Sequence, residues 1–215
     1  GYIQVAVNFP PMTAKYLYKR FTEHVKDQEV LRIYDPSSGW GGRILGAMSV
    51  RDDRRVHYIG TDPNPENQIP EEGISRYDYL AKFFNDNTYR GNGIFSDANT
   101  FETYDECAED IKNNPGFQKH KGKLDLVFTS PPYFNREGYA NDDKQSYQRY
   151  PGYQGWVDGF LRPTLETAVE YLRPQRYLLW NIADILMGKE YMPLEKDSKD
   201  ILESLGMEYK GFVKM

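Results

Sequence analysis

The segment Ser130-Pro131-Pro132-Tyr133 directly follows an apolar, strand-like run and carries groups that could hold a planar ring with an amino group. Proline has no backbone N–H, so the two prolines end the hydrogen-bond ladder and leave a carbonyl free to accept a bond from a ligand. The Ser130 hydroxyl is a second acceptor. Tyr133, or failing that Phe134, offers a flat face for stacking. The alternative is a rigid turn that only caps the strand.

Three aspartates, Asp35, Asp62 and Asp97, each stand at the end of a predicted strand. Asp62 lies about twenty residues after Gly42, the separation at which a carboxylate binds ribose hydroxyls in a nucleotide-binding βαβ unit. Followed by Pro63, it could instead only terminate its strand in a turn. Asp97 could accept a hydrogen bond from the amino group of an adenine. Because the carboxyl ends of parallel strands meet at one edge of a sheet, the three carboxylates together indicate a shared polar site.

A glycine-rich stretch, DPSSGWGGR at 35–43, joins the first predicted strand to a helix. Glycines at 39, 41 and 42 allow a tight turn and a close approach of the backbone to a ligand, and the following helix presents free amide groups. The stretch lacks the GxGxxG spacing and places Trp40 inside the loop, which disfavours a dinucleotide site. The alternative is a strand-to-helix turn with an aspartate cap.

Alternating strand-like and helix-like patterns position these segments. Strands separated by helices imply an α/β fold with a doubly wound, mostly parallel, Rossmann-like sheet. In such folds, ligands bind outside the carboxyl ends of the strands, where the strand order reverses. Pro163 could kink the fourth predicted helix. We predict strands at 31–35, 56–62, 93–98, 124–130, 176–184 and 207–215, and helices at 42–50, 74–84, 105–114, 156–172 and 193–205.

Length and composition limit the class of protein. The 215 residues fit a single domain, 1–215, with a loop insertion at about 135–156. The chain has 27 basic and 32 acidic residues and a net charge of −5, so no global basic footprint indicates nucleic acid, although a local patch is compatible with it. It opens on Gly1 and ends on Met215 just after a strand-like run. We therefore expect the chain to be part of a longer protein. The missing part could lie at the C-terminal end.

Cysteine usage and apolar runs bear on the compartment. Cys107 is the only cysteine, which excludes an internal disulfide framework and fits a reducing compartment. The sequence has no apolar run of membrane-spanning length and no signal-like N-terminus. We expect a soluble, cytoplasmic protein with no membrane partner.

Aromatic and basic residues alternate between 135 and 156. They could stack on splayed bases and contact phosphates, or they could form an aromatic-rich surface loop. The members are Tyr139, Tyr147, Tyr150, Tyr153 and Trp156 with Arg136, Lys144 and Arg149. The cations Lys15, Lys19 and Arg20 are more typical of a solvated helix face. The histidines His24, His57 and His120 lack metal-ligand spacing, so no metal is expected.

The ordered set DPSSGWGGR, GTDPNP, FSDA and TSPPYF resembles the amino-group DNA methyltransferases that use S-adenosylmethionine. The resemblance covers about 30–184, and NFPPMTAKYLYKRF before it resembles the helix that precedes the first motif in some members. It implies a Rossmann-like sheet of the methyltransferase type. Two departures are the SSGWGG form of the first motif and the lack of an evident target-recognition domain. They put sequence specificity in doubt.

The resemblance also implies roles for individual residues. Asp35, Ser37, Gly39 and Gly41 would border the methionine part of S-adenosylmethionine, Asp62 would bind its ribose, Pro63 would pack beside its adenine, and Asp97 with Ala98 would contact the adenine amino group. Ser130, Pro131, Pro132 and Tyr133 would hold a target base flipped out of DNA. Ser130 slightly favours cytosine-N4 over adenine-N6 methylation.

The expected chemistry is one in-line displacement, in which acceptors aim the amine lone pair at the methyl group. It needs no covalent enzyme intermediate. Cys107 lies in an acidic segment that would raise the pKa of its thiol, so we expect it to be structural. The alternatives are methylation of RNA or of a protein amide, a nucleic-acid-binding module without turnover, and a nucleotide-dependent oxidoreductase. The sequence leaves the oligomeric state open.

Overall fold

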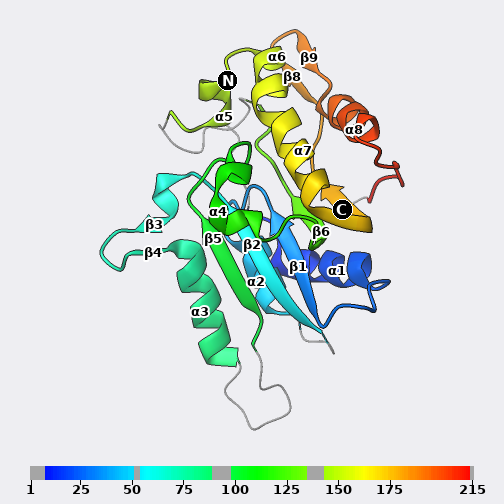
Figure 1. Cartoon of the computed structure of the whole chain (residues 1–215). Helices are drawn as coiled ribbons and strands as arrows, with labels where there is room; N and C mark the ends of the chain where they lie inside the picture. The colour runs from blue at the N-terminus through cyan, green and yellow to red at the C-terminus, as the bar shows by residue number, and fades with distance from the viewer. Residues whose placement is uncertain (1–7, 51–53, 89–97, 135–142, 214–215) are drawn as a thin grey trace.

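A parallel sheet forms the centre of the computed structural model, which describes residues 8–50, 54–88, 98–134 and 143–213 (Figure 1). Within these residues the sheet has five strands in the order β5-β2-β1-β6-β7, and all neighbouring pairs are parallel. The strands are β1 (Val30–Asp35), β2 (Arg55–Thr61), β5 (Thr100–Tyr104), β6 (Leu124–Thr129) and β7 (Leu172–Trp180).

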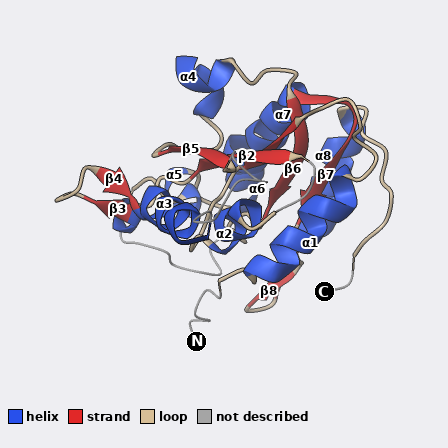
Figure 2. Ribbon diagram, turned by 90° about the horizontal axis from the view of Figure 1, so that it is seen from below, coloured by secondary structure: helices blue, strands red, loops and turns tan. Residues whose placement is uncertain are grey.

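Helices cover both faces of the sheet, as Figure 2 shows. One face packs against α1 (Pro11–Thr22), α2 (Gly42–Met48) and α3 (Arg76–Thr88). The other packs against α4 (Pro115–Gln118) and α7 (Arg162–Tyr171). The predicted doubly wound α/β sheet is therefore confirmed.

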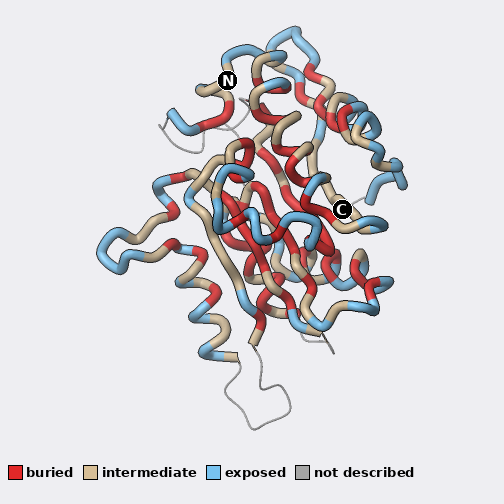
Figure 3. Tube along the Cα trace, in the orientation of Figure 1, coloured by how far each residue is buried: buried red, intermediate tan, exposed pale blue. Residues whose placement is uncertain are grey.

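The central strands are the most deeply buried part of the molecule (Figure 3). Every residue of β6 is buried, as expected for a parallel strand with helices on both faces. β1 is buried at its last three residues, which lead into the glycine-rich turn. The end of β1 is therefore enclosed in the core, between β2 and β6, and the glycine-rich turn starts from this buried position.

A second cluster of elements lies beyond the end of the sheet, at the top of Figure 1. It contains α5 (Ser146–Arg149), α6 (Tyr153–Trp156), α8 (Leu194–Ser204) and a hairpin of β8 (Ile185–Met187) and β9 (Glu190–Met192). Its centre is the fully buried Trp156, whose Nε1 donates to Ser146 Oγ at 3.0 Å.

The described part of the segment 135–156, which the sequence predicted to be a loop insertion, contains short helices. Residues 146–149 and 153–156 are helical, and the Trp156 ring is in the core. A π-helical turn, Val157–Leu161, joins α6 to α7. Pro163 lies inside this continuous helical run, two residues after the π-helical turn ends, where a residue without an N–H interrupts the regular α-helical bonding.

Other predicted elements agree with the structure or shift. The strands at 31–35, 56–62 and 124–130 and the helices at 42–50, 156–172 and 193–205 are confirmed to within a few residues. The helix expected from residue 74 starts at Arg76, after a short ribbon of β3 (Gln68–Ile69) and β4 (Ile74–Ser75). The helix expected at 105–114 is a single 3-10 turn, Ile111–Asn113.

The third predicted strand, at 93–98, lies outside the described residues except for Ala98, which is not in a strand. Within the described residues, the outer neighbour of β2 is β5, at Thr100–Tyr104. The predicted strand at 207–215 is wrong over 207–213, which form no strand and expose Tyr209, Phe212 and Val213.

The described helices include none with the length and apolar character needed to cross a bilayer.

The strand order places the ligand-binding edge. From β1 the chain proceeds outward through β2 to β5, then crosses over to β6 and continues to β7. The order therefore reverses between β1 and β6. In open α/β sheets the crevice outside the carboxyl ends of such strands is where ligands bind.

Helix α2 starts in very close contact with the segment before α1. The Gly42 N–H donates to Asn8 Oδ1 at 3.0 Å, and a Cβ at Gly42 would lie 1.8 Å from the carbonyl oxygen of Phe9. A Cβ at Gly46 would lie 2.7 Å from that of Ala14. Backbone atoms cannot move aside cheaply, so residue 42 must be glycine for this docking.

We expect Gly42→Ala to lower the free energy of unfolding by about 3 kcal/mol or more, because the new methyl group overlaps backbone. Gly155→Ala is the matched control, since a Cβ at Gly155 would lie 3.8 Å from its nearest neighbour, the carbonyl carbon of Tyr150. Urea unfolding followed by circular dichroism measures both. Equal stability of the two variants would show that the contact with Phe9 is not rigid.

Candidate active site

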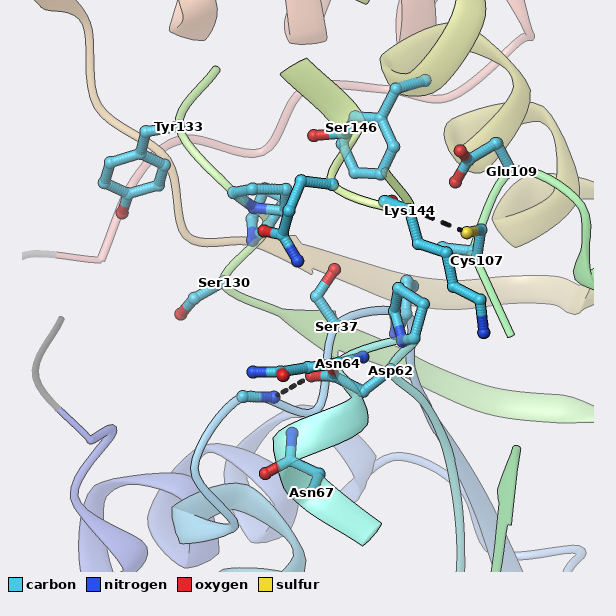
Figure 4. Close-up of a pocket in the computed structure, with 18 of the residues that line it drawn as sticks. Ser37, Asp62, Asn64, Asn67, Cys107, Glu109, Ser130, Tyr133, Lys144 and Ser146 are labelled. Atoms are coloured by element: carbon cyan, nitrogen blue, oxygen red, sulfur yellow. Dashed lines mark hydrogen bonds between the residues drawn. The ribbon is translucent and has the colours of Figure 1, made fainter. Parts of the chain in front are cut away.

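A pocket of about 270 Å³ opens at the switch point between β1 and β6 (Figure 4). Figure 4 shows Ser130 and Tyr133 at one end, Cys107 and Glu109 at the other, and Asp62 between them. Three predicted segments meet here. The lining residues that the sequence predicted are Ser37, Gly39, Asp62, Pro63, Ser130, Pro131, Pro132 and Tyr133.

Asp35 lies behind this wall, with no exposed surface. Its Oδ1 accepts from Thr129 Oγ1 at 2.7 Å and from the Ser37 N–H at 3.3 Å. Its Oδ2 accepts from Arg43 Nε and from the Tyr58 hydroxyl, both at 2.7 Å. Asp35 thus ties β1, β2, β6 and α2 together, and it shapes the pocket through these partners instead of bordering it.

Arg43 brings a positive charge to the pocket wall that the sequence prediction missed. Only 4% of its surface is exposed. Burial opposes its charge, but the adjacent Asp35 carboxylate outweighs burial and raises the pKa of the guanidinium above its usual value. Its Nη2 also donates to the Ser37 carbonyl, and its guanidinium carbon lies 5.8 Å from the centre of the Phe9 ring. Both Arg43 and Phe9 line the pocket.

The glycine-rich turn is held against Asp62. Gly39 has a φ of +61° and donates its N–H to Asp62 Oδ2 at 2.9 Å, while its carbonyl accepts from the Tyr77 hydroxyl at 2.5 Å. Gly41 has a φ of +87°, and a Cβ there would lie 2.7 Å from Leu80 Cδ1. Gly41 does not line the pocket, so its role is to form the turn that presents Gly39.

Asp62 has a carboxylate that is already partly engaged. Its Oδ1 accepts from the Asn64 N–H at 3.0 Å. Burial raises the pKa of Asp62 above its usual value, and the N–H groups of Asn64 and Gly39 limit the rise. The residue is half-buried, at the pocket wall, so its carboxylate remains within reach of a polar ligand.

The polar end opposite Ser130 comes from residues that the sequence prediction did not single out as pocket residues. Cys107, Ala108 and Glu109 follow β5 and line the pocket. Asp97 lies outside the described residues, and Ala98 precedes β5, so it stands near the amino end of that strand and not in the pocket wall. Placing the third strand at Thr100–Tyr104 would have indicated the correct segment.

The thiol of Cys107 is kept protonated. Burial, followed by the nearby Glu109 carboxylate, raises its pKa to about 11. The sequence predicted this rise in the pKa of the thiol. It also predicted a helix here, whereas Cys107 lies just before a turn, at the pocket wall. Arg149 fixes this turn through ion pairs with Glu109 and with Asp110, the latter at 2.8 Å.

The Ser130-Pro131-Pro132-Tyr133 corner is braced by one further residue. Asn181, just after β7, donates from Nδ2 to Ser130 Oγ at 2.8 Å, and its main-chain carbonyl accepts from the Tyr133 hydroxyl at 3.1 Å. Its own N–H donates to the Thr129 carbonyl at 3.0 Å. Asn181 lines the pocket, and only its position at a strand end could have indicated it.

The aromatic face at this corner belongs to Tyr133. Phe134, the other candidate, is only 6% exposed and packs in the second core, with its ring centre 5.8 Å from those of Tyr153 and Trp156. Its φ of +50° turns the chain from the pocket wall into that core.

Three of the aromatic and basic residues at 135–156 have structural roles. Trp156 is buried, Arg149 is paired with acidic side chains, and the Tyr153 hydroxyl donates to Asp197 Oδ2 at 2.6 Å. These three stabilise the fold. Arg136 and Tyr139 lie outside the described residues, so contact with nucleic acid by this region stays a prediction.

Comparisons with known proteins identify the fold. Neither protein-family models nor curated proteins give a match. The chain is similar to the CurJ carbon methyltransferase (12% identity, TM-score 0.51), covering 92% of this chain and 46% of that one. It is similar to the rRNA methyltransferase AviRa from Streptomyces viridochromogenes (13% identity, TM-score 0.50), covering 94% and 91%. MNMC2 from Aquifex aeolicus also aligns (16% identity, TM-score 0.45), covering 88% and 52%. The chain thus spans about half of the CurJ and MNMC2 structures. It has the Rossmann-like fold of the methyltransferase type.

Proposed function

We propose that the chain binds S-adenosylmethionine in this pocket and transfers its methyl group to an exocyclic amino group of a base in DNA, with cytosine-N4 slightly favoured over adenine-N6. The observation that carries the proposal is the meeting of the glycine-rich turn, Asp62 and the Ser130–Tyr133 corner in one pocket at the switch point. The similarity in fold to methyltransferases supports it.

The cofactor end fits the proposed group. A side chain at Gly39 would be strained by its positive φ, so the main chain there can approach a ligand closely. Asp62 would accept hydrogen bonds from the ribose, and Cys107 and Ala108 would border the adenine. Arg43 would attract the carboxylate of the methionine part. When bound, the cofactor supplies an electrophilic methyl group on a sulfonium.

The other end would orient the amine. A hydroxyl oxygen has two lone pairs, and Ser130 Oγ uses one to accept from Asn181. The second can accept from the amine, and the hydroxyl hydrogen can donate to a ring nitrogen. The Pro131 carbonyl would be the second acceptor, and the Tyr133 ring would stack on the base. These fixed acceptors would aim the amine lone pair at the methyl group.

RNA is the second candidate substrate. AviRa, an rRNA methyltransferase, aligns over most of both chains. The corner recognises a planar amine and does not distinguish the polymer that carries it.

A cysteine nucleophile of the kind used in cytosine-C5 methylation is disfavoured, because the pKa of the Cys107 thiol is about 11 and the thiolate is scarce at neutral pH.

The first test is of cofactor binding. Asp62→Ala should weaken S-adenosylmethionine binding about 10- to 100-fold, because hydrogen bonds to a carboxylate are lost. Isothermal titration calorimetry measures the affinity, and Asp86→Ala, on an exposed part of α3, is the control. Unchanged affinity in a folded Asp62→Ala protein would remove the assigned ribose site.

The second test is of methyl transfer. The chain, incubated with labelled S-adenosylmethionine and either DNA or RNA, should label DNA, and nucleoside analysis should show N4-methylcytosine. Ser130→Ala should lower kcat about 100-fold or more, because a preorganised acceptor is removed. Asn181→Ala should lower kcat less, because it acts through Ser130.

Cofactor affinity should stay unchanged in both variants, which separates the amine site from the cofactor site. Label in RNA alone would replace DNA as the substrate. Full activity of Ser130→Ala would rule out the amine clamp.

The third test uses the pH dependence of Cys107 alkylation. A pKa of about 11 instead of 9.0 means about 100-fold less thiolate near pH 8. The iodoacetamide rate should therefore keep rising with pH up to about 11, and added S-adenosylmethionine should slow it, because Cys107 lines the pocket. A rate that levels off near pH 9, or one that the cofactor does not change, would contradict this placement.

A further inference from the structure

Two histidines and a glutamate, far apart in the sequence, meet at the β5 edge of the sheet. His57 is in β2, Glu102 is in β5 and His120 follows α4. His57 Nε2 lies 3.0 Å from Glu102 Oε1, and His120 Nε2 lies 3.5 Å from Glu102 Oε2. One nitrogen or oxygen atom from each residue lies within 4.8 Å of those of the other two. None of the three lines the pocket described above.

We propose that His57, Glu102 and His120 form a binding site for a divalent transition-metal ion such as Zn²⁺. Two imidazoles and a carboxylate are a donor set that Zn²⁺ prefers. Zinc bonds of about 2.0–2.2 Å put neighbouring ligand atoms about 3.3–3.5 Å apart in a tetrahedral site. The two nitrogen-to-oxygen distances, 3.0 Å to Glu102 Oε1 and 3.5 Å to Glu102 Oε2, are close to this spacing, although each histidine lies nearest a different oxygen of the carboxylate. The fourth position would hold water.

The histidines are held in place as metal ligands usually are. His57 Nδ1 forms a hydrogen bond with Thr100 Oγ1 at 2.7 Å, which directs Nε2 towards Glu102. His120 is 4% exposed and its ring packs 6.0 Å from that of Phe117. The two imidazole centres are 5.7 Å apart. His120 follows the short helix α4, in a turn that can move slightly to close the ligand set.

The Glu102 carboxylate is held by a further donor. Its Oε2 accepts from the Tyr104 hydroxyl at 2.8 Å, which fixes the carboxylate between the two imidazoles.

Lys119 is the cation that now balances Glu102. Its Nζ lies 2.7 Å from Glu102 Oε2, and its side chain is 54% exposed. An exposed ammonium can move into water at little cost, so a divalent ion can displace it. Lys119 and the metal would compete for the same carboxylate. Removing Lys119 should therefore strengthen metal binding, which a plain hydrogen-bond network would not explain.

A metal ion bound to these residues would link three elements of the fold. It would join the edge strand β5 to β2 and to the turn after α4, and β5 leads directly into the Cys107–Glu109 wall of the pocket. Its expected effect is to stabilise this edge. The inference does not depend on the proposed methyl transfer, because binding is measured without a methyl acceptor or cofactor.

The test is a Co²⁺ titration of the tag-free, chelator-treated chain, followed by visible absorption, with Zn²⁺ as a competitor. We expect the bands of four-coordinate Co²⁺, loss of these bands on adding Zn²⁺, and a higher melting temperature with Zn²⁺. Glu102→Gln and His120→Ala should weaken Co²⁺ binding at least about 100-fold, and Thr100→Ala about 10-fold. Lys119→Met should bind Co²⁺ more tightly than the unchanged chain.

Two variants serve as controls. His24→Ala removes a histidine outside the cluster, and Cys107→Ser removes the thiol of the neighbouring Cys107, Glu109 and Asp110 group, the other set whose ligand atoms lie close together in the described residues. Both should keep the Co²⁺ affinity. The site would be ruled out if the chain bound neither ion, if Lys119→Met bound no more tightly, or if Cys107→Ser abolished the bands. Because Lys119→Met leaves the buried residues intact, misfolding of His120→Ala would not protect the proposal.

Discussion

The buried carboxylate of Asp35 is the interaction on which the pocket depends. An ionised group without exposed surface is costly unless donors surround it. Here four donors do so: Arg43, Tyr58, Thr129 and the Ser37 N–H. They come from α2, β2, β6 and the glycine-rich turn, so satisfying one charge fixes the relative positions of four segments. The carboxylate also keeps Arg43 charged at the pocket wall. Asp35, which does not line the pocket, thereby sets the shape and the charge of this part of the pocket wall.

Asp62 shows how the same chemistry serves two purposes. Its carboxylate accepts from the N–H groups of Gly39 and Asn64, which pins the turn at the end of β1 to the end of β2. It also faces the pocket. Because its oxygens already hold the turn, a ligand that binds to Asp62 meets a main chain that is ordered in advance. Preorganisation of this kind reduces the entropy cost of binding.

The sequence predicted the parts of the site that are local and failed where pairing between distant segments decides. The central strands are apolar throughout, so β1, β2 and β6 and the turns after them were predicted correctly. β5 is an edge strand whose residues are mostly half-buried, with Glu102 among them, so its pattern is weak and the sequence did not indicate that Cys107–Glu109, which follow it, line the pocket. Asn181 reaches Ser130 only because β7 pairs with β6. His57 and Glu102 meet only because β2 pairs with β5, so no spacing in the sequence could indicate them.

The two ends of the pocket are built in different ways, and this bears on how the chain can select a substrate. The end near Gly39 and Asp62, proposed for the cofactor, rests on main-chain groups and buried charges. The end proposed for the amine rests on Ser130, which accepts from the Asn181 side chain, and on Tyr133, which donates to the main-chain carbonyl of Asn181. A substitution at Asn181 would remove the donor to Ser130, while the main-chain contact to Tyr133 and the Asp62 end of the pocket would remain. In the proposed function, the acceptor that faces the amine can therefore be altered at residue 181, just after β7, without rebuilding the fold.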